Sequence, residues 1–325
     1  MTFMRRLFRQ KRFIIGFVII AVILVASFSF HHLIRPLYPD KPEELLYSKS
    51  GDLLAKAPFP PSRYFPLGTD YIGTPFELDL IPEAKNTIIG GVLIAFFRLF
   101  LALFVGQFLS LLGKRAFAFL HQVLTAFNYI PVTLLAFIVL APAHLPTLRG
   151  QFTLIFIVLT LVALPNLSIQ LAMEIREVKR REFIVASRTI GAREGFVFRR
   201  HVLPFLRTKL ILLFNQQMIQ VLALFVALGL LYIGAQTDKP DEGLGLTDML
   251  LGGLQHIWVM RWMLYDPVLA ILIIIIAIQM MTSAVRKVAN GEDRKKRYRK
   301  KVKLAAETPI EDTLFVFTQP LNKKA

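Results

Sequence analysis

Residues 182–193 read Glu182-Phe-Ile-Val-Ala-Ser-Arg-Thr-Ile-Gly-Ala-Arg193, and residues 200–204 read Arg200-His-Val-Leu-Pro204. This polar, basic loop separates two long apolar segments. Glycine at 191 suits a sharp turn because it adopts positive φ freely. Proline at 204 suits the start of the next helix, since the N–H that it lacks would have no partner there. The pattern predicts a short helix, a turn and a second short run on the face of a membrane bundle.

The rest of the chain has the composition of a membrane protein. Hydrophobic residues make up 55% of the 325 positions, whereas soluble domains contain about 45–50% apolar residues. A helix needs about 20 predominantly apolar residues to cross a bilayer. Six segments meet or approach this length, and we predict a spanning helix in each: 13–30, 86–112, 116–141, 152–173, 210–235 and 267–285.

The net charge of +17 is distributed by side of the membrane. With six spans, 29 of the 39 Lys and Arg residues fall before the first span, after the last, or in the connections on that same side. The positive-inside rule places this side, with both termini, in the cytoplasm. Thirteen of the 22 acidic residues lie on the opposite side, in 40–83 and 238–266. The charge therefore indicates topology, and nucleic-acid binding is not expected because few aromatic residues are interleaved with the basic ones.

Hydropathy divides the chain into consecutive parts. We interpret the first apolar run as a retained anchor because it exceeds the 7–15 residues typical of a signal peptide. The basic tail is expected to be attracted to anionic lipid headgroups. The parts are a cytoplasmic N-terminus (1–12), a first transmembrane helix (13–34), an extracytoplasmic segment (35–85), a five-helix core (86–289) that contains the polar loop (177–207), and a basic cytoplasmic tail (290–325).

The polar loop resembles the "EAA" signature of ABC importer permeases. In the oligopeptide and dipeptide branch this signature reads Glu-Tyr-Val-x-Ala-Ala-Arg-x-x-Gly-Ala, followed by Arg-His-Ile-Leu-Pro. The chain matches it without insertion, with Ser187 in place of the second Ala. The matching residues are Glu182, Ala186, Arg188, Gly191, Ala192 and the run Arg200-His-Val-Leu-Pro204.

Two further segments are similar to the C-type subunit of that branch. Pro66-Leu-Gly68-Thr69-Asp70 resembles its His-Pro-Leu-Gly-Thr-Asp motif, which lies outside the membrane before the second span. Ile130-Pro131-Val-Thr-Leu-Leu-Ala is similar to its third span. The resemblance covers about residues 60–285 of the chain.

The resemblance implies an all-α membrane protein with six transmembrane helices, the type I ABC importer permease fold, and a cytoplasmic coupling helix over about residues 180–190. It implies a permease subunit of an ATP-driven importer for oligopeptides or dipeptides in the bacterial plasma membrane. The implied partners are a second homologous permease subunit, two cytoplasmic ABC ATPase subunits that bind the ATP, and an extracytoplasmic substrate-binding protein. No cofactor is expected in this chain itself.

The same resemblance implies two sets of site residues. The implied ATPase-coupling residues are Glu182, Ala186, Ser187, Arg188, Gly191, Ala192 and Pro204. The implied extracytoplasmic motif is Gly68, Thr69 and Asp70.

Departures from the family pattern leave alternatives open. Thr74-Pro75 stand where the branch has Arg-Asp, and Phe205 stands where Asn is usual. These differences bear on the substrate more than on the architecture. A diverged permease for nickel, a sugar or another small solute is one alternative, and a membrane scaffold without transport is another. The loop alone could also be an amphipathic helix at the membrane surface.

Polar residues within the expected spans are candidates for the substrate path. Burying Arg98 at mid-bilayer costs about 2.5–3.5 kcal/mol on insertion scales, so it should face protein or water, lining the path or pairing with a partner subunit. Displacement toward the membrane surface is the alternative. Gln216 and Gln220 lie one turn apart on one helix face. We expect their amides either to contact the peptide backbone in a cavity or to bridge neighbouring helices. Asn166 and Gln170 are interpreted as bridges between helices.

Catalytic motifs are missing from the sequence. It contains no His-Glu-x-x-His and no Gly-x-Ser-x-Gly. Gly113-Lys114-Arg115 does not form a phosphate-binding loop, because no Ser or Thr follows the Lys. With no Cys, a disulfide framework and a thiolate metal site are excluded. We therefore expect neither an enzyme nor a metal site, and ATP hydrolysis is expected of partner subunits.

Overall fold

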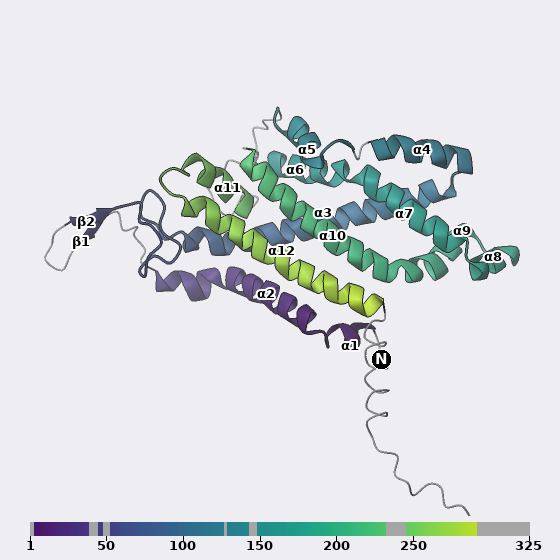
Figure 1. The fold of residues 1–325 in the computed structure, drawn as a ribbon, viewed down its shortest axis with the longest axis horizontal. Helices are drawn as coiled ribbons and strands as arrows, with labels where there is room; N and C mark the ends of the chain where they lie inside the picture. Colours follow the sequence, from purple (N-terminus) through teal and green to yellow (C-terminus); the bar gives the residue numbers. More distant parts are fainter. Residues whose placement is uncertain are drawn as a thin grey trace, which may run out of the picture.

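The computed structural model describes residues 3–38, 45–47, 53–126, 129–142, 148–231 and 245–290, so that the basic tail from residue 291 lies outside the described residues. Long helices run side by side along one axis (Figure 1). The elements are α1 (Phe3–Leu7), α2 (Lys11–Phe28), η1 (Phe30–Ile34), η2 (Arg35–Leu37), β1 (Leu45–Tyr47), β2 (Leu53–Lys56), α3 (Glu77–Leu111), α4 (Lys114–Ala126), α5 (Val132–Leu140), α6 (Leu148–Val162), α7 (Leu164–Lys179), α8 (Glu182–Thr189), α9 (Glu194–Val197), η4 (Phe198–Val202), α10 (Leu203–Leu230), α11 (Leu246–Gln255) and α12 (Trp262–Ala289).

The two ends of the bundle differ. The antiparallel hairpin β1–β2 and helix α11 lie at one end, which we call the hairpin end (Figure 1). Helices α8 and α9 lie at the opposite end, which we call the loop end. Helix α1 packs against α12, so the N-terminus also lies toward the loop end.

The prediction of a mostly helical membrane protein is confirmed. Among the described residues, four helical runs are long and apolar enough to cross a bilayer: Lys11–Phe28, Glu77–Leu111, Glu194–Leu230 and Trp262–Ala289. The pair α6 and α7 passes the same test as one span bent by 43°. The described part of the chain thus holds up to five candidate spans, and the predicted count of six is not confirmed.

The difference arises in the predicted third span, residues 116–141. Helix α4 ends at Ala126 and α5 begins only at Val132, after Pro131. Proline disfavours helical geometry at the residue before it, which favours an interruption of the hydrophobic run at this point. Hydropathy measures composition and does not detect this break. The two pieces pack in succession, α4 against α7 and α5 against α6.

Helix α3 begins at Glu77 rather than at residue 86, where the apolar run starts. Its first turns contain Pro82, which removes one helical hydrogen bond. Ser27 of α2 bonds the backbone of α3 beside this proline. Its hydroxyl donates to the Pro82 carbonyl at 2.9 Å and accepts from the Lys85 N–H at 3.2 Å. The contact also ties α2 to α3.

Helix α3 is the centre of the bundle, where it packs against α7, α10, α2 and α6. The main core joins Ile94 of α3 to Leu222 and Phe225 of α10 and to Ile274 of α12. Helix α3 approaches α7 closely at Gly106. A Cβ on Gly106 would lie 3.0 Å from the Ser168 carbonyl oxygen, so a larger residue would push α7 away by a few tenths of an ångström.

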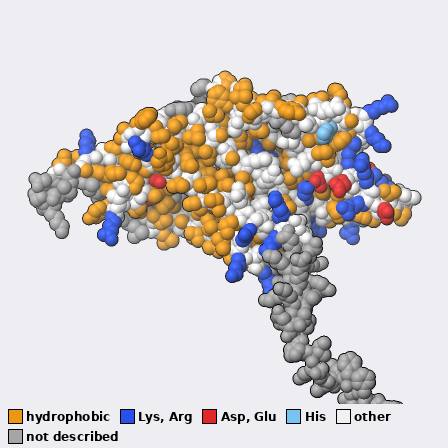
Figure 2. All heavy atoms as spheres, viewed as in Figure 1, with side chains coloured by type: hydrophobic (Ala, Val, Ile, Leu, Met, Phe, Trp, Pro, Cys, Tyr) orange, Lys and Arg blue, Asp and Glu red, His pale blue; other side chains and the backbone are white. Residues whose placement is uncertain are grey.

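Large apolar side chains also cover the outside of the bundle. Phe17 of α2, Phe100 and Phe104 of α3 and Ile273 of α12 are about half exposed. In Figure 2 hydrophobic side chains cover the middle of the molecule, and many of the basic side chains gather toward the loop end. Exposure of so large an apolar surface is unfavourable in water but not in lipid. The chain is therefore a multi-pass membrane protein.

The close approach at Gly106 predicts a stability defect. In Gly106→Val the added carbons meet the α7 backbone, and overpacking of this kind costs about 1–3 kcal/mol. We expect detergent-solubilised Gly106→Val to lose its monodisperse size-exclusion peak several degrees below the wild type. Gly113→Val is the control, because no atom lies within 4 Å of a Cβ at Gly113. Equal thermal profiles for both variants would contradict the packing argument.

Candidate functional site

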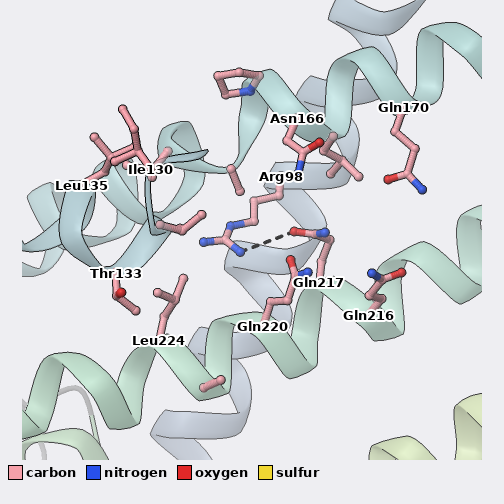
Figure 3. A pocket seen from close by; sticks show the side chains of 16 residues that line it. Arg98, Ile130, Thr133, Leu135, Asn166, Gln170, Gln216, Gln217, Gln220 and Leu224 are labelled. Carbon is pink, nitrogen blue, oxygen red and sulfur yellow. Dashed lines mark hydrogen bonds between the residues drawn. The ribbon is translucent and has the colours of Figure 1, made fainter. Parts of the chain in front are cut away.

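A polar cavity opens where two helices break. Helix α6 ends at Val162 and α7 begins at Leu164, with Pro165 in its first turn. The resulting 43° bend leaves a cavity of about 410 Å³ between α3, α5, α7 and α10 (Figure 3). This volume falls within the range of about 300–1,000 Å³ typical of ligand pockets. Arg98 is the one charged residue among those that line it.

Arg98 is fully buried, with 0% of its surface exposed. Its Nε donates to the Leu159 carbonyl at 2.8 Å and its Nη1 to Oε1 of Gln217 at 3.4 Å. Leu159 lies in the last turn of α6, where carbonyls lack helical partners and the helix dipole is negative. Arg98 therefore caps α6. The sequence left open a displacement of Arg98 toward the membrane surface. In the structure Arg98 is instead buried within the protein.

Arg98 keeps one donor without a partner. Its Nη2 is buried and makes no hydrogen bond within the described part of the chain. None of the ion pairs among the described residues involves Arg98 either. A buried guanidinium with a free donor attracts an anion.

Amide side chains line the remaining cavity wall. Gln216 and Gln220 are exposed on one face of α10, as the helical spacing predicts, while Gln217 is buried beside Arg98. Asn166 and Gln170 of α7 also line the cavity, although we interpreted them as bridges between helices. Figure 3 shows Arg98 between Asn166 and Gln220. The sequence did not identify Gln217, Asn166 and Gln170 as residues that line a cavity. The reason is that the cavity arises from the helix break before Pro165, which was not predicted.

The polar loop folds as its sequence predicts. Helix α8 begins at Glu182 and ends at Thr189, and Gly191 follows with φ 91°. The Gly191 N–H donates to the Arg188 carbonyl at 2.9 Å and the Ala192 N–H to the Ser187 carbonyl at 3.1 Å. Glycine is favoured here because left-handed backbone strains other residues.

The second half of the loop leads into the next span. Helix α9 and the π-helical turn η4 join α10, and Pro204 stands in the first turn of α10. Pro204 therefore lies where the sequence places a helix start.

Ion pairs and a small core fix the loop to the bundle. Glu194 of α9 pairs with Lys179, the last residue of α7, at 3.2 Å and with Arg188 of α8 at 2.7 Å. Lys179 also donates to Ser110 of α3 at 3.0 Å. Ile184 of α8 is fully buried against α7 and α10 residues of the same cluster. These contacts attach the loop to the end of α7.

The outward face of the loop remains uncovered. Glu182, Phe183 and Ala186 of α8 are exposed, and Ile190 is 88% exposed. An acidic group beside uncovered apolar side chains on a rigid helix is a surface that another protein can bind.

The Gly68–Asp70 motif forms a closed turn at the hairpin end. Thr69 is fully buried, and its hydroxyl accepts from the Phe59 N–H at 2.9 Å. Asp70 Oδ1 accepts from the N–H groups of Ile72 and Thr74. The Thr69 carbonyl accepts from the indole N–H of Trp262 at 2.9 Å. These residues fasten the segment to the start of α12.

The three sets of predicted residues therefore occupy three places. Arg98, Gln216 and Gln220 line one cavity, the 182–204 residues form the loop, and Gly68, Thr69 and Asp70 lie at the hairpin end. Among the described residues no group of three or more His, Asp or Glu could hold a metal ion.

Comparisons with known proteins point in one direction. Residues 98–290 match the family described as binding-protein-dependent transport system inner membrane component. The chain is 27% identical over 230 residues to the peptide transport system permease protein SapC of Escherichia coli O6:H1, which covers 70% of this chain and 75% of that protein. It is 24% identical over 264 residues to the oligopeptide transport system permease protein OppC of Bacillus subtilis, which covers 81% of this chain and 80% of that protein.

The double ion pair of Glu194 predicts how firmly α8 is held. Glu194→Gln removes the charge that faces both Lys179 and Arg188, and because Glu194 is 44% exposed we expect a loss of only about 1 kcal/mol in local stability. Amide hydrogen exchange in α8 should rise about fivefold. The control is Glu177→Gln, an exposed carboxylate on α7. Unchanged exchange in Glu194→Gln would show that the small core alone holds α8.

Proposed function

The chain belongs to the binding-protein-dependent transport system inner membrane component family, and from this premise we propose that it is the permease subunit of an ATP-driven importer of peptides. The observation that carries the proposal is the rigid helix-turn-helix between α7 and α10, which presents an uncovered face. Peptides are the proposed substrates because SapC and OppC are named as peptide and oligopeptide permeases.

The proposed partners follow from what the chain lacks. Its sequence carries no phosphate-binding loop, so ATP is bound and hydrolysed by two cytoplasmic ATPase subunits. Helix α8 is the coupling helix, and it is displaced when an ATPase subunit changes conformation. A second homologous permease chain completes the translocation path, and an extracytoplasmic binding protein delivers the peptide.

The proposed orientation places the loop end in the cytoplasm. The basic residues of α8 to α10 support it through the positive-inside rule, and α1 lies toward the same end. The sixth crossing is supplied by α4 and α5 together. Their packing in succession against α7 and α6 supports this arrangement.

The mechanism is a rigid-body movement. Glu194 of α9 pairs with both Arg188 of α8 and Lys179 at the end of α7, and the start of α7 lines the cavity. A force on α8 is therefore transmitted along α7 to the cavity through which substrate passes. The length of α7 follows from a rise of about 1.5 Å per residue. Such rocking requires a stiff connection, which the ion pairs provide.

The cavity favours a peptide over the alternative solutes. Arg98 repels a cation such as nickel, whereas amides such as Gln216 and Gln220 donate to and accept from a peptide backbone. Amides also bind sugars, so a sugar remains the second candidate. A membrane scaffold without transport does not require a polar cavity at the break of a span.

The most direct test is uptake of labelled di-, tri- and tetrapeptides in a strain that lacks the chain, with and without the restored gene. Restored, ATP-dependent peptide uptake supports the proposal. Uptake of a labelled sugar but of no peptide would instead favour the second candidate.

The turn at Gly191 predicts a coupling defect. Valine at a positive φ is strained by about 1–2 kcal/mol, so Gly191→Val should reorient α8, lower co-purification of the ATPase subunits and reduce peptide uptake severalfold. Gly195→Val is the matched control, since neither glycine has an atom within 4 Å of a Cβ and only Gly191 has positive φ. If both variants retain wild-type association and uptake, α8 does not couple.

The exposed carboxylate of Glu182 predicts a defect that leaves the fold intact. Reversal of its charge in Glu182→Lys should weaken the complex with the ATPase subunits about tenfold, as loss of a charge pair at an interface does. The comparison variant Glu177→Lys reverses an exposed charge on the neighbouring helix α7. Dissociation constants for the purified ATPase subunits, measured in nanodiscs, decide between contact at α8 and a general charge effect.

A further inference from the structure

We infer that the α6–α7 break is a carboxylate-binding site, in which Arg98 and the first turn of α7 hold the C-terminal carboxylate of the transported peptide. This inference rests on the proposed function and names the chemical group that the cavity recognises. It predicts that a peptide with a free C-terminus and the same peptide with a C-terminal amide are handled differently by the permease itself.

The free donor of Arg98 is the first observation. The guanidinium is fully buried, its Nε and Nη1 are used by Leu159 and Gln217, and its Nη2 has no partner within the described residues. The cavity lining contains no carboxylate. In a low-dielectric span this cation gains most from an anion that forms a charge-assisted hydrogen bond with it.

The start of α7 is the second observation. A helix N-terminus carries unpaired N–H groups and a partial positive charge, and both attract anions. Here the N-cap is Ala163, whose side chain makes no capping hydrogen bond, and Pro165 and Asn166 of this first turn line the cavity. The first turn of α7 and the Arg98 side chain therefore line the same cavity.

The other lining residues fit the remainder of a peptide. Gln216 and Gln220 are exposed along one face of α10 and Asn166 is exposed on α7 (Figure 3). Amide side chains donate to carbonyls and accept from N–H groups, so they bind a backbone whatever its side chains are. Leu224 and Leu135 add apolar wall. This combination recognises one fixed charge and a variable chain.

Gln217 is a positioning residue in this site. Its Oε1 accepts from Arg98 Nη1 at 3.4 Å, and 5% of its surface is exposed. Replacement by Glu keeps the shape of the side chain and adds a carboxylate next to the guanidinium. Gln217→Glu should therefore supply the missing counter-charge from within the chain and make Arg98 unavailable to a substrate.

The experiment measures ATP-dependent uptake of trialanine and of trialanine amide by the complete transporter in proteoliposomes. The binding protein is unchanged throughout, so a variant that alters the ratio of the two uptake rates acts through the permease. We expect the wild type to prefer trialanine, and the preference to fall about tenfold in Arg98→Gln and in Gln217→Glu, the effect of one charge-assisted hydrogen bond. Arg98→Lys should keep part of it.

Arg5→Gln, which removes an exposed arginine of α1, is the control and should keep the wild-type ratio. Equal loss of both uptake rates in Arg98→Gln, with the ratio unchanged, would overturn the inference and leave Arg98 with its role as the cap of α6. If Arg98→Gln does not assemble, the ratio in Gln217→Glu decides. Failure of the wild type to take up either probe would reject the proposed peptide transport itself.

Discussion

The arrangement depends on one buried guanidinium. Inside a membrane backbone carbonyls need partners within protein, and Arg98 of α3 supplies one in the last turn of α6, where its Nε donates to the Leu159 carbonyl. The cap allows α6 to end in the middle of the apolar region, and the chain then resumes as α7 after a 43° bend. Without Arg98 the final carbonyls of α6 would lack partners in an apolar surrounding. The cavity is thus a consequence of how the break is stabilised.

One helix connects this cavity with the exposed loop. Helix α7 begins at the break with Pro165 in its first turn and ends at Lys179, where Ser110 and Glu194 hold it. The close approach of α3 at Gly106 supports the helix between these points. The loop and the cavity are therefore connected by one helix rather than by a series of loops. The exposed loop at one end and the polar cavity in the middle of the bundle are for this reason parts of one connected unit.

Local signals in the sequence were sufficient for some elements and insufficient for others. The helix from Glu182, the turn at Gly191 and the position of Pro204 follow from residue-level preferences, and the structure has all of them. The face shared by Gln216 and Gln220 followed from helical spacing. The capping role of Arg98 did not, since it requires a carbonyl sixty-one residues away. The third span was wrong as a single helix because hydropathy does not register the break at Pro131. The start of α3 at Glu77 was also not predicted, because the apolar run begins only at residue 86.

The bond between Trp262 and the Thr69 carbonyl has a practical consequence. Trp262 packs against Gly68, and the other tryptophan of the chain, Trp258, is 87% exposed. Indole emission depends on the polarity around the ring, so the two tryptophans emit from different environments. Their combined spectrum reports whether the segment around Thr69 is attached to α12 or released from it. The protein thus carries an intrinsic optical probe of its hairpin end, and no chemical label is needed to observe that end during a transport cycle.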